Sequence, residues 1–120
     1  MEALVGPLID SLRHAVPMLV RTSPTSEEYL EGILSRDDLQ RCCTLLTDAL
    51  GASVKAFDQA VRFEPSMQKV VAGLGGIRLE QCLFLKPVGA QRAIYAALWP
   101  WASDASRITL KVGVVNVGPS

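Results

Sequence analysis

With 120 residues, 49% hydrophobic and 20% charged, the chain has the composition of a globular protein and not of a disordered one. Its formal net charge is zero, which does not suit a strongly basic nucleic-acid-binding protein. A chain of this length can bury a core without disulfides or a metal ion, so we expect one domain spanning residues 1–120.

The amino terminus lacks the pattern of a secretory signal, because Glu2 and Asp10 precede Arg13 and no long apolar run follows a basic start. The longest apolar stretch, residues 93–99, is far shorter than the ~20 residues that a membrane-spanning helix needs. We therefore expect a cytoplasmic protein with no membrane association.

Three cysteines, Cys42, Cys43 and Cys82, are an odd number, and neighbours on a helix do not pair easily. We expect reduced, largely buried thiols. His14 is the only histidine and the chain has no Cys-x-x-Cys pair, so a multi-histidine site and the usual zinc spacings are both missing, and we expect no metal and no cofactor.

Three helices are expected before residue 51. Apolar residues at helical spacing predict a first helix that kinks or ends before Pro17. The spacing of Thr25 and Glu28 is typical of a capping box and predicts a second helix over residues 26–34. A third helix begins after Ser35 and ends at Gly51, with a clear apolar face.

Residues 54–64 fit either a short helix or a loop. A short helix from Ser66 is expected to end at the glycines of residues 73–76. The amino-terminal part, residues 1–76, is thus predicted to be helical.

After Gly76 the apolar residues alternate, which predicts strands from residue 77 and again over residues 107–114. Residues 91–99 fit a strand or a helix. As a strand they complete a three-stranded antiparallel sheet over residues 77–117; as a helix they give a strand-helix-strand unit. We favour the meander, and with it an α+β protein whose helices pack on the carboxy-terminal sheet.

If one side of the meander faces the helices, the opposite side carries aromatic and basic residues. The side expected to face the helices comprises Ile77, Leu79, Leu83, Leu85, Ile94, Ala96, Leu98, Ile108, Leu110 and Val112. The side expected to bind a partner comprises Cys82, Phe84, Lys86, Tyr95, Trp99 and Lys111. Because an exposed aromatic surface usually has a partner, we expect a protein-interaction module, in the simplest case a homodimer or a subunit of a larger assembly.

Two alternatives stay open. The carboxy-terminal half is mildly basic, so a nucleic acid or an anionic ligand is a second candidate partner, bound by Arg78, Lys86, Arg92, Arg107 and Lys111. A small enzyme or ligand carrier with a pocket between the helices and the sheet is the third. No residue pattern singles out a catalytic group, so we favour a non-enzymatic protein. A pair formed by Cys43 or Cys82 with His14 is not excluded by spacing.

Overall fold

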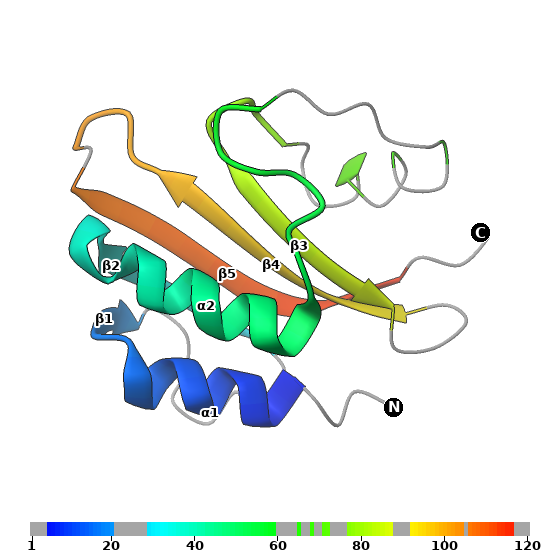
Figure 1. The fold of residues 1–120 in the computed structure, drawn as a ribbon, viewed down its shortest axis with the longest axis horizontal. Helices are drawn as coiled ribbons and strands as arrows, with labels where there is room; N and C mark the ends of the chain where they lie inside the picture. The colour runs from blue at the N-terminus through cyan, green and yellow to red at the C-terminus, as the bar shows by residue number, and fades with distance from the viewer. Residues whose placement is uncertain are drawn as a thin grey trace.

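The computed structural model describes residues 5–20, 29–59, 65, 68, 71–72, 77–87, 92–104 and 106–116. Within these residues the named elements are two α-helices, a 3-10 turn and five strands (Figure 1). In chain order the elements are α1 (Val5–Ala15), β1 (Met18–Val20), β2 (Leu30–Ser35), the 3-10 turn η1 (Arg36–Asp38), α2 (Leu39–Leu50), β3 (Cys82–Pro87), β4 (Arg92–Pro100) and β5 (Arg107–Asn116).

The sheet is antiparallel throughout, with strand order β1-β2-β5-β4-β3. Both helices lie side by side on one face of it, as Figure 1 shows. Their apolar sides and the facing strand residues form the main core, which includes Leu12, Leu46, Leu98 and Leu110, each fully buried. The α+β class and the antiparallel carboxy-terminal strands were both expected from the sequence.

The first and third predicted helices are confirmed. One stripe of α1 is buried and consists of Val5, Leu8, Ile9 and Leu12. The helix ends two residues before Pro17, because proline has no amide hydrogen to donate within a helix. Helix α2 follows η1, and its carboxy-terminal cap is Gly51 with φ +86°, a backbone conformation that suits glycine.

The predicted helix over residues 26–34 is wrong for the part that the structure describes. Residues 30–35 form β2, and Leu30 and Leu34 reach the core while Glu31 and Ile33 lie on the other face. Hydrogen bonding between β2 and β5 satisfies this backbone, so pairing across the fold decides against the helix. The capping pair Thr25 and Glu28 lies outside the described residues.

The sheet has five strands, not three, because β1 and β2 from the first half of the chain extend the carboxy-terminal meander. Residues 92–100 are the central part of that meander, so the strand-helix-strand alternative is wrong. Successive residues of β4 are apolar because both faces of this strand are buried. Its sequence therefore does not alternate between apolar and polar residues, and it is hard to distinguish from that of a buried helix. The prediction that residues 1–76 are all helical fails for the same two strands.

Strand β3 begins at Cys82, later than expected. Residues 78–81 form a turn, closed by a bond from the Gln81 amide to the Arg78 carbonyl, 3.1 Å long. In the β3–β4 register Cys82 lies opposite Leu98 and Phe84 opposite Ala96. Because paired residues share a face, Cys82 and Phe84 face the helices. Leu83 and Leu85 face the other way, so the expected orientation of this strand is reversed.

The segment after α2, undecided from the sequence, is irregular over residues 51–59 and covers the outer edge of β3. Lys55 forms a bridge with Leu83 and is only 3% exposed. Its ammonium donates to the carbonyls of Ala56, Leu79 and Gln81 at 2.8, 2.6 and 2.6 Å. The two bonds to Leu79 and Gln81 tie the segment to the turn before β3.

The helix predicted from Ser66 falls mostly outside the described residues; Val71 and Ala72 have helical backbone. No helix within the described part of the chain is long and apolar enough to cross a membrane.

Candidate functional site

The candidate site is the face of the sheet that points away from α1 and α2, which we call the distal face. Its residues alternate with the core residues along each strand. On β2 and β5 they are Glu31, Ile33, Arg107, Thr109, Lys111, Gly113 and Val115; on β4 they are Ala93, Tyr95, Ala97 and Trp99.

Both tyrosines and both tryptophans of the chain lie on the distal face. Tyr95 and Trp99 project from β4. Trp101 follows the end of that strand, two residues after Trp99, and its side chain lies on the same face. Tyr29 precedes β2 and donates to Glu31 Oε1 at 3.1 Å. All four side chains are half-buried. Aromatic side chains with polar tips thus gather on one side of the molecule.

Tyr29 and Tyr95 meet over Gly113 on the central strand β5. A Cβ atom at Gly113 would lie 3.1 Å from Tyr29 Cδ1 and 3.1 Å from the Tyr95 ring. Glycine therefore leaves the space that the two rings occupy. Burial raises the pKa of both phenols, and the Glu31 hydrogen bond adds to the rise in the pKa of Tyr29. Both are neutral hydrogen-bonding groups at physiological pH.

Each tryptophan has a cation next to it. Lys111 Nζ lies 4.1 Å from the centroid of the Trp99 ring, and the Arg107 guanidinium carbon lies 5.5 Å from that of Trp101. Trp101 Nε1 donates to Thr109 Oγ1 at 2.8 Å. By contrast, Trp99 Nε1 is buried and has no hydrogen-bond partner in the described structure.

The distal face is covered at one side and accessible at the other. Val54, Val71 and Ile77 pack against Leu83 and Ala97 on the β3 and β4 side. On the opposite edge strand, Leu19 is 64% exposed, and its neighbour Ile33 on β2 is half-buried. The accessible part is therefore formed by β1, β2, β5 and the aromatic side chains of β4.

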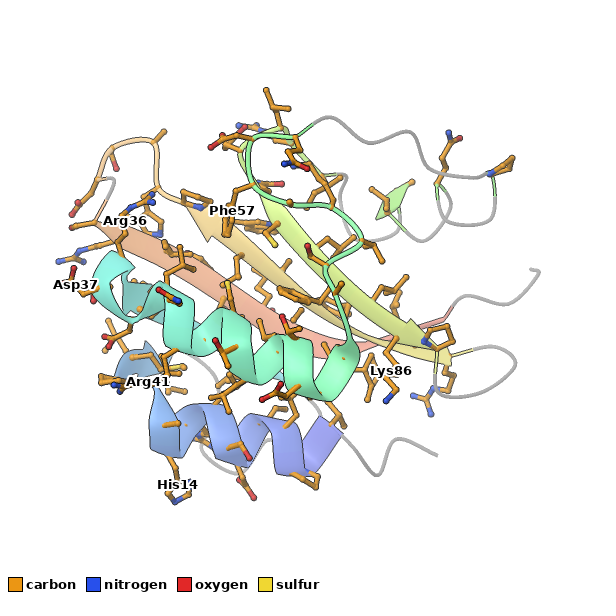
Figure 2. The ribbon with its side chains drawn as sticks, viewed as in Figure 1. His14, Arg36, Asp37, Arg41, Phe57 and Lys86 are labelled. Atoms are coloured by element: carbon orange, nitrogen blue, oxygen red, sulfur yellow. The ribbon has the colours of Figure 1, made fainter. Side chains whose placement is uncertain are left out.

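The outer faces of the helices have a different chemistry. Exposed residues of α2 are polar, among them Gln40, Arg41, Thr44 and Thr47. Those of α1 include Asp10, Ser11 and His14, and Figure 2 shows His14 and Arg41 on the side of the helices. Among the described residues, both tyrosines and both tryptophans therefore lie on the sheet side, whereas the exposed residues of α2 are polar.

The six residues expected to bind a partner divide between the two faces. Tyr95, Trp99 and Lys111 lie on the distal face, as expected. Cys82 and Phe84 are buried in the core, each 3% exposed, and so cannot contact a partner. Lys86 lies next to the end of α2, where its Nζ is 3.4 Å from the Ala49 carbonyl oxygen.

The five basic residues of the alternative anion-binding set are also dispersed. Arg107 and Lys111 share the distal face and lie against tryptophans. Arg78 is exposed in the turn before β3, and Arg92 is exposed at the start of β4. With Lys86 beside α2, the five do not form a single patch.

The sequence reasoning missed Tyr29, Glu31, Ile33 and Trp101. For the first three, the alternation with Leu30, Gly32 and Leu34 indicates a strand, whereas the upstream capping pair Thr25 and Glu28 favours a helix. For Trp101 the signal is its position two residues after Trp99, because side chains two residues apart in an extended chain point to the same side.

Two of the three cysteines, Cys42 and Cys82, are buried, and Cys43 is half-buried. Burial raises the pKa of Cys42 to about 12 and that of Cys82 to about 11, so both stay protonated at neutral pH. His14 is exposed on α1 and its Nδ1 lies 2.8 Å from the Asp10 carbonyl, so it is not brought to the buried Cys82. Within the described residues no cluster of three or more His, Cys, Asp and Glu side chains is placed to hold a metal ion.

Comparison with known proteins gives no relative: no family model, no curated protein and no solved structure matches the chain.

Proposed function

We propose that the chain is a small protein-interaction module and that its contact surface is the accessible part of the distal face. The simplest partner is a second copy of the chain, which makes the protein a homodimer. The observation that carries this proposal is the position of Tyr29, Tyr95, Trp99 and Trp101, all on the sheet side opposite the polar helices.

Interface energetics support this choice. Tyrosine and tryptophan are enriched at interfaces because they bury a large apolar area while their polar tips make hydrogen bonds. Leu19 and Ile33 add aliphatic surface next to them. Glu31 on β2 lies opposite Lys111 on β5, so the surface contains both signs of charge and a two-fold related copy meets no large field of like charge.

A single-stranded nucleic acid is the second candidate partner. It is favoured by the two cation and tryptophan pairs, since bases stack on aromatic rings and phosphates attract cations. Against it stands the dispersion of the other basic residues. Its binding would weaken steeply with salt, whereas an apolar protein contact would not.

The test is the molar mass in solution, measured by light scattering from low to high micromolar concentration. We expect a concentration-dependent dimer for the native chain and loss of the dimer in Ile33→Glu and in Leu19→Glu. The matched control is Gln40→Glu, which adds the same charge to the exposed face of α2. This control should leave the dimer intact.

A native chain that stays monomeric at high micromolar concentration would overturn the homodimer. Dissociation of the control to the same extent as Ile33→Glu would show that the distal face is not the contact. Tight binding of an oligonucleotide that disappears with added salt and with Lys111→Met would favour the second candidate.

A further inference from the structure

A pocket of about 420 Å³ lies on the helix side of the molecule, away from the distal face. Its walls come from the first half of α1, the last turns of α2 and the end of β3, and they include Leu8, Ser11, Leu45, Asp48, Leu50 and Lys86. A pocket of this volume falls within the roughly 300–1,000 Å³ that small-molecule sites occupy. Its lining combines leucine side chains with a few polar groups.

Lys86 is the cation of this pocket. Its side chain is half-buried, and its Nζ contacts the Ala49 carbonyl oxygen at 3.4 Å, longer than the usual 2.7–3.2 Å of such bonds. An ammonium group has three donors. In the described structure this long contact is the hydrogen bond that Lys86 makes, so two donors remain for a ligand. Figure 2 shows Lys86 beside the carboxy-terminal end of α2.

The acidic surroundings limit which anion fits. Asp48 lines the same pocket, and the carbonyl end of α2 carries partial negative charge. Both oppose a second negative charge, so a dianion such as a phosphate monoester is disfavoured. A ligand with one carboxylate meets less repulsion, and its apolar body gains from burial against Leu8, Leu45 and Leu50.

We propose that this pocket binds a small apolar molecule that bears one carboxylate, of the medium-chain fatty-acid type. The carboxylate lies at Lys86 Nζ and the hydrocarbon part lies between α1 and α2. The site is independent of the proposed interaction through the distal face, because the two lie on opposite sides of the sheet.

The experiment is calorimetric titration of the full chain with sodium decanoate, with decanol and decyltrimethylammonium as the neutral and cationic probes of the same chain length. We expect decanoate to bind more tightly than both. Loss of a hydrogen bond to a charged group corresponds to a decrease of roughly tenfold or more, which we expect for Lys86→Met. Lys86→Arg should retain most of the binding.

Asp48→Asn removes the opposing charge and should tighten decanoate binding severalfold. Arg78→Met removes an exposed cation outside the pocket and serves as the matched control, with unchanged affinity expected. Thermal unfolding of each variant without ligand checks that the fold is retained.

Absence of decanoate binding to the native chain would overturn the proposal. Equal affinity for decanoate and decanol, together with no effect of Lys86→Met on decanoate binding, would also overturn it, because the pocket would then show no preference for a carboxylate. Amide chemical-shift changes on β2 and β5 instead of α1 and α2 would place the ligand on the distal face and also refute the proposal.

Discussion

Lys111 on β5 lies over the ring of Trp99 on β4, with its Nζ 4.1 Å from the ring centroid. This contact fixes a cation on the distal face and covers part of the indole. The Trp99 N–H is buried without a hydrogen-bond partner in the described structure, whereas the Trp101 N–H donates to Thr109 Oγ1. The two tryptophans therefore differ in one measurable respect.

Replacement of each tryptophan by phenylalanine should reveal that difference. Both changes remove the same atoms, but Trp101→Phe also breaks a hydrogen bond, while Trp99→Phe removes a buried donor that has none. We expect Trp101→Phe to lower the free energy of unfolding by about 0.5–1.5 kcal/mol more than Trp99→Phe. Urea denaturation measures both.

Thr109→Val provides the check on this comparison. It should reduce stability in the native background and have little effect after Trp101→Phe, as in a double-mutant cycle. Equal costs of Thr109→Val in the two backgrounds would contradict the assigned bond.

Lys55→Met should be strongly destabilising. The change leaves three carbonyl oxygens, of Ala56, Leu79 and Gln81, without the buried ammonium that they share. We expect a loss of about 2–4 kcal/mol in the free energy of unfolding. Arg78→Met, in an exposed position of the adjacent turn, should change it by less than about 0.5 kcal/mol. A similar small effect of both would show that the Lys55 contacts are weak.

Gly113→Ala should destabilise the protein by about 1–3 kcal/mol, because the new methyl group would meet the rings of Tyr29 and Tyr95 at 3.1 Å. The rings must then move, and tyrosine ring signals in NMR spectra would shift. If the distal face is the dimer contact, the same variant weakens the dimer. Unchanged stability and unchanged ring signals would be inconsistent with the packing.

Stability should fall at alkaline pH, in part because of Cys82. Burial raises its pKa from the usual 9.0 to about 11, so the folded state favours the protonated thiol more than the unfolded state does. This contribution is fully present below the unfolded pKa and is lost as the pH rises through the folded value. Thermal unfolding between about pH 8 and about pH 10.5 should therefore show a falling Tm.

Cys82→Ala isolates this contribution, because the half-buried tyrosines and Cys42 keep their own pH dependence. The variant should be less stable at pH 8, since it loses a buried side chain, yet its Tm should fall less steeply with pH. Parallel curves for the two proteins would exclude Cys82 as a source of the alkaline loss.

The sequence by itself determined the elements whose patterns are local. The apolar stripe of α1, Pro17 after it, Gly51 at the end of α2 and the alternation of β5 each follow from the periodicity or backbone preference of nearby residues. The favoured strand over residues 91–99 also predicted Tyr95 and Trp99 on one face, and Lys111 was expected to share it because the apolar residues of both strands were expected to face the helices.

Tertiary structure decided the rest. Residues 82–85 are apolar at both parities and buried on both sides, so the register with β4, and not the pattern, directs Cys82 and Phe84 into the core. Residues 30–35 form a strand because β5 supplies their hydrogen-bond partners from about 80 residues away in the chain. The alternation over residues 30–34 does not show which strand they pair with, and it is this distant pairing that brings Tyr29 and Glu31 next to Tyr95 and Lys111 to complete the distal face.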